Sequence, residues 1–207
     1  MKCECCDCEY FRDKDILKQC MSCGVLYKGV YPLPPDRIYM KDNDNQMEGL
    51  RDLRTYLKEN CKMDKGLEIG TWLGASANIF APIFKTFYCV DGWWGDPTTP
   101  EVYHGCTFNL RFNDNINFIE KISEDAATKF EDDSLDFVYI DGDHRPEFVK
   151  QDIELWLPKL KKGGIIAGHD YGRGVEENFD FRGLTKVVDD KFENITVFKD
   201  SSWLAFK

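Results

Sequence analysis

The sequence has few of the features that direct a chain to a membrane or to nucleic acid. No apolar run approaches the roughly 20 residues that a membrane-spanning helix needs, and the first residues do not match a signal peptide. The 27 basic residues are outnumbered by 37 acidic ones, and the net charge of −10 disfavours binding through phosphate contacts. We therefore expect a cytoplasmic protein that binds neither membranes nor nucleic acid.

Histidine is also scarce, with three residues in 207, whereas cysteine is abundant. A chain of this length that is 43% hydrophobic can form one α/β domain and a small appendage. Six of the nine cysteines lie within the first 23 residues. Without a secretion signal, such a cluster favours a metal site over disulfide bonds.

The clustered cysteines form Cys-x-x-Cys pairs, in which two thiolates can bind one ion. Two pairs together complete a tetrahedral structural zinc site. The ligands that we expect are Cys5, Cys8, Cys20 and Cys23. Cys3 and Cys6 are alternative ligands, and a cysteine-rich tail without a metal is the rival interpretation.

The chain is expected to have three parts. Residues 1–30 form a zinc-ribbon-like unit that could contact a protein partner. Residues 31–44 are a linker that contains several prolines, and residues 45–207 form the main domain.

Two apolar, β-rich runs in the main domain each end in polar residues. Residues 135–140 lead into Asp141-Gly-Asp-His144, and residues 163–168 lead into His169-Asp170. The apolar residues between them have helical spacing. A strand–helix–strand unit gives two parallel strands that end at one edge of a sheet, where α/β proteins bind ligands. Two of the three histidines thus lie beside carboxylates at this edge; a polar turn without function is the alternative.

An earlier segment predicts a site for a nucleoside. Residues 67–70 end a strand, a turn runs from Gly70 to Gly74, and a helix is expected from Ala75. The Glu-x-Gly-x-x-x-Gly pattern differs from the dinucleotide pattern, and a structural turn is an alternative. The next strand, residues 86–90, ends in Asp91. A carboxylate at this place can hold ribose hydroxyls. The alternative interpretation is that Asp91 is a solvated aspartate in a turn.

The remaining elements complete an α/β pattern. We expect helices over 45–60 and 183–193, a strand over 116–122, and a terminal hairpin formed by strands 195–200 and 201–207. Residues 92–115 form an aromatic, polar insertion that lines a substrate site or is simply a loop with a short helix. Its candidates for substrate or cofactor contact are Trp93, Trp94, Tyr103 and His104.

Together, Glu68-x-Gly70-x-x-x-Gly74, Asp91 and the segments around Asp141 and His169 resemble the class I S-adenosylmethionine-dependent methyltransferases. The resemblance covers about 40–207 and is nearest to the bacterial and phage sugar and antibiotic O-methyltransferases, which are distantly similar to catechol O-methyltransferase. It implies a Rossmann-like α/β fold whose seven-stranded sheet has an antiparallel last strand. The residues that it implies for S-adenosylmethionine are Glu68, Gly70, Thr71, Trp72, Gly74, Asp91, Ser123, Glu124 and Asp141.

The resemblance also implies roles at the two polar strand ends. Asp141, His169 and Asp170 would bind a divalent cation, magnesium or manganese, although a histidine stands where the resembled enzymes carry a carboxylate. His144 occupies the place of a lysine base, so His144 and Asp141 are the expected catalytic residues. A metal ligand or a helix cap is the alternative role for His144.

The expected function is therefore a metal-assisted O-methyltransferase for a small hydroxylated acceptor, with a sugar or glycoside as first choice. A metal-independent N-methyltransferase and an inactive methyltransferase-like binding module are the alternatives.

Overall fold

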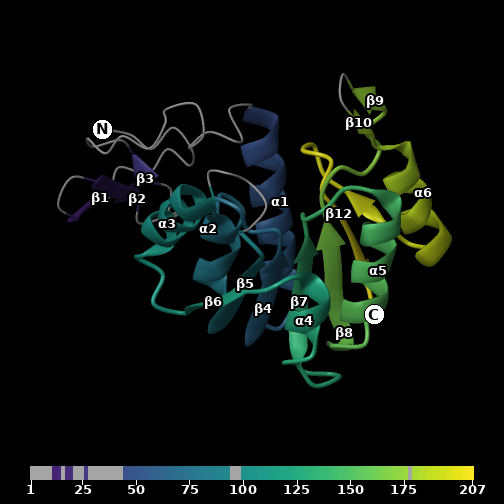
Figure 1. Cartoon of the computed structure of the whole chain (residues 1–207), viewed down its shortest axis with the longest axis horizontal. Helices are drawn as coiled ribbons and strands as arrows, with labels where there is room; N and C mark the ends of the chain where they lie inside the picture. Colours follow the sequence, from purple (N-terminus) through teal and green to yellow (C-terminus); the bar gives the residue numbers. More distant parts are fainter. Residues whose placement is uncertain (1–10, 15–16, 21–25, 28–43, 94–98, 177–178) are drawn as a thin grey trace.

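The apolar runs of the sequence form the strands of one seven-stranded sheet, in the order β11-β12-β8-β7-β4-β5-β6 (Figure 1). The structure is a computed structural model, and it describes residues 11–14, 17–20, 26–27, 44–93, 99–176 and 179–207. The strands of this sheet are β4 (Lys65–Ile69), β5 (Thr86–Asp91), β6 (Ile116–Glu120), β7 (Leu135–Ile140), β8 (Leu160–Gly168), β11 (Thr196–Val197) and β12 (Trp203–Phe206).

The strand directions place several strand ends at one edge. β4 runs parallel to β5 and β7, β5 parallel to β6, and β7 parallel to β8. Ile140 at the end of β7 pairs with Ile69 of β4 and with Gly168 of β8, so these three strands end level with one another. β12 runs antiparallel to both β8 and β11. The predicted parallel unit, terminal hairpin and antiparallel last strand are confirmed.

Helices cover both faces of the sheet. On one face α1 (Asp44–Asn60) packs with α2 (Ala77–Phe80) and α3 (Thr99–Leu110), and α1 buries Leu50, Leu53 and Leu57 at helical spacing. On the other face lie α4 (Ser123–Ala127), α5 (Pro146–Trp156) and α6 (Arg182–Lys191). Because both faces are covered, all six residues of β7 are buried.

Some predicted elements are shorter in the structure. The helix expected from Ala75 is the four-residue α2, followed by a 3-10 helix, Ala81–Ile83, that contains a proline. The strand expected over 195–200 is only Thr196–Val197, because the chain turns back where the Phe198 N–H donates to the Ser202 carbonyl. The insertion over 92–115 contains α3, which is a regular helix of 12 residues.

Two smaller sheets complete the described chain. Strands β1 (Phe11–Lys14), β2 (Leu17–Cys20) and β3 (Leu26–Tyr27) form an antiparallel sheet, and β9 (Val175–Glu176) pairs with β10 (Phe179–Asp180). The predicted zinc ligands Cys5, Cys8 and Cys23 lie outside the described residues, as do the side chain of Cys20 and most of the linker 31–44. Among the helices that the structure describes, none has the length and apolar character needed to cross a membrane.

Candidate active site

A cavity of about 670 Å³ opens at the carboxyl edge of the sheet. Its walls come from the segments that follow β4, β5, β6 and β7 and from α5. The volume lies in the range of small-molecule sites. Of the residues predicted to bind the methyl donor, those that line the cavity are Gly70, Trp72, Asp91, Ser123, Glu124 and Asp141.

Gly70 brings the loop after β4 into contact with the loop after β7. Its φ is +82°, and a Cβ at this position would lie 2.2 Å from the carbonyl oxygen of Asp141. Only glycine fits both the conformation and this close approach. The backbone of this loop can therefore approach a bound ligand closely, as the sequence pattern predicts.

Asp91 organises the same wall through backbone hydrogen bonds. Its carboxylate accepts from the Trp72 N–H at 2.7 Å and from the Trp93 N–H at 2.8 Å. Both tryptophans have positive φ, 43° and 46°, which is uncommon for bulky residues. Burial raises the pKa of the Asp91 carboxyl, although the hydrogen bonds from these two N–H groups oppose the shift. Asp91 therefore holds the backbone of both tryptophans beside the cavity.

Three of the predicted donor-binding residues do not line the cavity: Glu68, Thr71 and Gly74. Glu68 is fully buried and accepts a hydrogen bond from the Ser76 hydroxyl. The Gly74 N–H donates to the Thr71 carbonyl at 2.7 Å, and a Cβ on Gly74 would meet Leu110 at 2.7 Å. In the described structure these residues shape the loop.

The far wall of the cavity joins the segment after β6 to α5. The Ser123 hydroxyl donates to Asp152, and the Gln151 side-chain amide donates to Glu124 at 2.6 Å. Burial raises the pKa of Asp152 to about 6, and the Ser123 hydrogen bond opposes the shift. Gln151 and Asp152 were not predicted. Asp152 lies at helical spacing from the buried residues of α5, which was the available signal.

The aromatic insertion contributes one wall residue. Trp93 lines the cavity and packs against Tyr103, with ring centroids 5.0 Å apart. Tyr103 and His104 are not on the cavity wall, and His104 is exposed. Trp94 lies outside the described residues.

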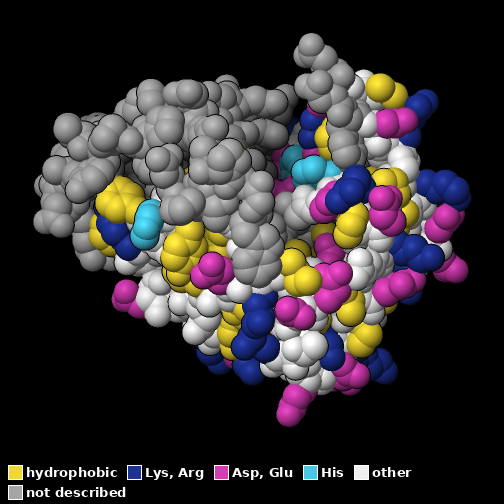
Figure 2. All heavy atoms as spheres, viewed as in Figure 1, with side chains coloured by type: hydrophobic (Ala, Val, Ile, Leu, Met, Phe, Trp, Pro, Cys, Tyr) yellow, Lys and Arg dark blue, Asp and Glu magenta, His cyan; other side chains and the backbone are white. Residues whose placement is uncertain are grey.

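At the rim of the cavity, Asp141, His144 and Asp170 each offer a ligand atom, and these atoms lie within 4.8 Å of one another. Asp141 and His144 also line the cavity, and histidine and acidic side chains meet in a recess of the surface (Figure 2). His144 Nδ1 lies 2.8 Å from Asp170 Oδ2. Asp170 has a φ of 66°, which bends the chain directly after His169. Two carboxylates and an imidazole form a donor set that suits a divalent cation.

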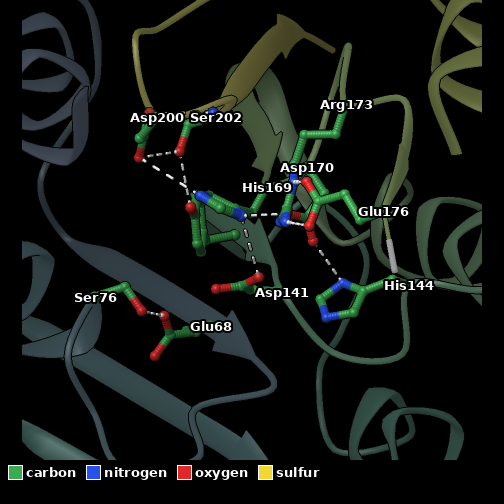
Figure 3. Close-up of polar contacts among 11 residues, drawn as sticks. Glu68, Ser76, Asp141, His144, His169, Asp170, Arg173, Glu176, Asp200 and Ser202 are labelled. Carbon is green, nitrogen blue, oxygen red and sulfur yellow. Dashed lines mark hydrogen bonds and ion pairs between the residues drawn. The ribbon is translucent and has the colours of Figure 1, made fainter. Parts of the chain in front are cut away.

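Asp170 is paired on both of its oxygens. Oδ1 contacts His169 Nδ1 at 2.8 Å and also accepts from the Arg173 guanidinium, while Oδ2 faces His144 (Figure 3). Burial alone would raise the pKa of Asp170, but the hydrogen bonds with His144 and His169 hold it well below its usual range. The hydrogen bond with Asp170 raises the pKa of His144, against the effect of burial. The described structure thus contains an Asp–His pair at the cavity rim.

His169 lies behind this rim. Its Nδ1 is 3.9 Å from Asp141 Oδ1, and its Nε2 is 3.8 Å from Asp200 Oδ2 (Figure 3). The group of potential metal ligands within the described residues contains His144 and does not include His169. Asp200 and Arg173 were not predicted, because neither belongs to a recognisable motif.

A family model described as a methyltransferase domain matches residues 67–171, just over half of the chain. The match spans the Gly70 loop, Asp91 and both strand ends that carry the rim residues. The chain therefore belongs to this methyltransferase domain family, and its fold is that of the S-adenosylmethionine-dependent methyltransferases.

Individual relatives are more distant. The protein y4gI of Sinorhizobium fredii, described as uncharacterized, is 30% identical over 115 residues, which are 50% of this chain but only 13% of that protein. A candidate O-methyltransferase from Klebsiella pneumoniae has a TM-score of 0.58 at 16% identity, over 77% of this chain and 79% of that one. A candidate caffeoyl-CoA O-methyltransferase from Staphylococcus aureus has a TM-score of 0.57 at 17% identity, over 76% and 82%. These solved structures show the shared fold.

Proposed function

We propose that this domain is an O-methyltransferase for a small hydroxylated acceptor, with a sugar or glycoside as first choice, and that magnesium or manganese assists it. The observation that carries the proposal is the position of Asp141 and His144. Both line the cavity that contains Gly70 and Asp91, and both belong to the group that could hold a cation. Donor site and acceptor activation would then lie in one cavity.

In this proposal each rim residue has one role. S-adenosylmethionine supplies a methyl group that its sulfonium charge already activates. Asp141 and Asp170 would hold the cation, whose chemistry is to lower the pKa of the acceptor hydroxyl. His144 donates its Nδ1 proton to Asp170, so Nε2 is the nitrogen that takes the acceptor's proton.

The test is formation of S-adenosylhomocysteine by the full chain with a panel of sugars and glycosides, with and without Mg²⁺ or Mn²⁺. We expect turnover that requires both a hydroxylated acceptor and a cation. His144→Gln distinguishes a general base from a metal ligand. If His144 is the base, the substitution lowers kcat by about 100-fold, in the range of general-base effects, and leaves the cation Kd unchanged. A weakened cation Kd would instead make His144 a ligand. No product with any acceptor would contradict the proposed activity.

The second candidate is a metal-independent N-methyltransferase, and one observation favours the part of it that concerns the cation. His144, His169 and Arg173 already pair with the Asp170 carboxylate in the described structure. Activity that persists in excess chelator, at the same rate after Mg²⁺ is restored, would support this candidate and remove the metal from the mechanism. Failure to bind S-adenosylhomocysteine in calorimetry would point to a binding module without activity.

We also propose that Cys5, Cys8, Cys20 and Cys23 hold a structural zinc in a unit, residues 1–30, that contacts a protein partner in the cytoplasm. The support is the pairing of the cysteines in the sequence. Metal analysis should find one zinc per chain, and Cys20→Ser with Cys23→Ser should lose it. Full zinc content in that variant would contradict this ligand set.

A further inference from the structure

We propose that His169 and Asp200 are a buried pair of positioning residues that orients the carboxylates of the cation site. The inference rests on the proposed function, because it concerns how Asp170 and Asp141 are presented to a cation. It changes the role that the sequence suggested for His169, from metal ligand to a support behind the ligands.

The two ring nitrogens of His169 face different partners. Nδ1 is 2.8 Å from Asp170 Oδ1, so it carries a proton and donates it to this carboxylate. Nε2 points toward Asp200 Oδ2, 3.8 Å away, and has no hydrogen-bond partner among the described residues. The ring is 5% exposed. Because His169 binds Oδ1 of Asp170, the other oxygen, Oδ2, faces His144 and the proposed cation site.

Asp200 is itself held in place from three directions. Its Oδ1 accepts from the Ser202 N–H at 3.1 Å, and its Oδ2 accepts from the Ser202 hydroxyl at 2.8 Å. The Ser202 hydroxyl lies 2.9 Å from the Tyr139 hydroxyl in β7. A Cβ on Gly49 in α1 would lie 2.2 Å from Asp200 Oδ1, so this helix packs directly against the carboxylate.

These contacts hold the buried Asp200 carboxylate behind the His169 ring. Asp200 is 4% exposed, and its only ring-nitrogen neighbour in the described structure is His169. The buried Asp200 carboxylate lies against the outer edge of the ring and limits how far the ring can turn away from Asp170. Partners behind metal ligands contribute about 10- to 100-fold to metal affinity.

The experiment measures Mn²⁺ binding to the full chain by electron paramagnetic resonance of the free ion. The relevant site is the one that Asp141→Asn removes. His169→Ala should weaken this site by about 10- to 100-fold. His169→Asn, whose amide nitrogen replaces the Nδ1 donor, should recover part of the affinity. Asp200→Asn and Gly49→Ala should weaken it in the same direction, although neither residue belongs to the cation site.

Asp136→Asn is the matched control. Asp136 is a buried carboxylate of β7 at the opposite end of the strand, paired with Lys161, so its loss reports general destabilisation only. Calorimetry with S-adenosylhomocysteine confirms that each variant is folded; if His169→Ala does not fold, the other variants decide. Wild-type Mn²⁺ affinity in both Asp200→Asn and Gly49→Ala, or in a folded His169→Ala, would overturn the inference alone. No Mn²⁺ site in the wild-type chain would overturn the proposed cation site together with it.

Discussion

The two halves of the candidate active site are built by different means. The proposed donor half, residues 67–93, is shaped by backbone geometry: Gly70, Trp72 and Trp93 have positive φ, and Asp91 accepts backbone N–H groups. The proposed acceptor half, the segment 135–173 with Asp200, is shaped by charged side chains that pair with one another. The donor half should therefore be sensitive to added volume and the acceptor half to removed charge.

The largest expected effect comes from removing charge in the acceptor half. Asp141→Asn should lower kcat by at least about 100-fold, equivalent to about 2.7 kcal/mol of barrier, because the proposed cation loses a ligand. The melting temperature should stay close to that of the wild type, because the substitution keeps the size of the side chain. Near-wild-type turnover in this variant would refute the metal-assisted mechanism.

The next effect comes from adding volume in the donor half. Gly70→Ala places a methyl group 2.2 Å from the Asp141 carbonyl oxygen and strains a φ of +82°. We expect a loss of about 1–3 kcal/mol in unfolding free energy and a clear loss of donor affinity, measured by urea titration and calorimetry. Gly163→Ala is the control, because its φ is +76° with open space around the added Cβ. Equal effects in both variants would assign the loss to backbone strain and not to the contact.

Removing the charge of Asp91, whose carboxylate accepts backbone N–H groups, should give an intermediate effect. Asp91→Asn keeps an acceptor for only one of the two tryptophan N–H groups, so we expect donor affinity to fall by about tenfold, or about 1.4 kcal/mol. Tryptophan fluorescence should change as well. Asp132→Asn, at an exposed ion pair with Lys159, provides the comparison. Unchanged affinity for the donor would mean that the hydrogen bonds from the two tryptophan N–H groups to Asp91 serve the fold and not donor binding.

An effect of about the same size is expected in the pH dependence of stability, and it arises from Asp152 on the far wall of the cavity. The folded-state pKa of Asp152, about 6, lies above its ordinary value of 3.8, so its contribution to stability is complete below pH 3.8 and is lost as the pH rises through 6. Between pH 5 and pH 7.5 the wild type should lose about 1.4 kcal/mol relative to Asp152→Asn. Urea titrations of both proteins measure this difference, and a difference that does not vary with pH would contradict it.

Much of the fold could be predicted because strand and helix periodicity is local information. The runs over 135–140 and 163–168 with a helix between them determine a parallel pair, and so the meeting of Asp141 with Asp170. The role of His169 could not be predicted in this way. Asp200 lies in a turn about 30 residues later in the sequence, and no local pattern links it to His169.

The donor-binding residues show the same limit on a smaller scale. The pattern Glu-x-Gly-x-x-x-Gly located the loop, but only Gly70 of these three residues lines the cavity. Glu68 points into the interior, where it accepts from Ser76, because alternate residues of β4 face opposite sides of the sheet. A motif identifies a stretch of backbone, while the direction of each side chain depends on the packing around it.

The contact between Gly70 and Asp141 has a consequence for ligand binding. The two loops meet backbone to backbone, with no flexible side chain between them. A ligand that pushes one loop toward the other therefore meets backbone and no side chain that could move aside. If the proposed donor and acceptor each displace one of these loops, their binding would be thermodynamically linked, and each would change the affinity of the other by the same factor.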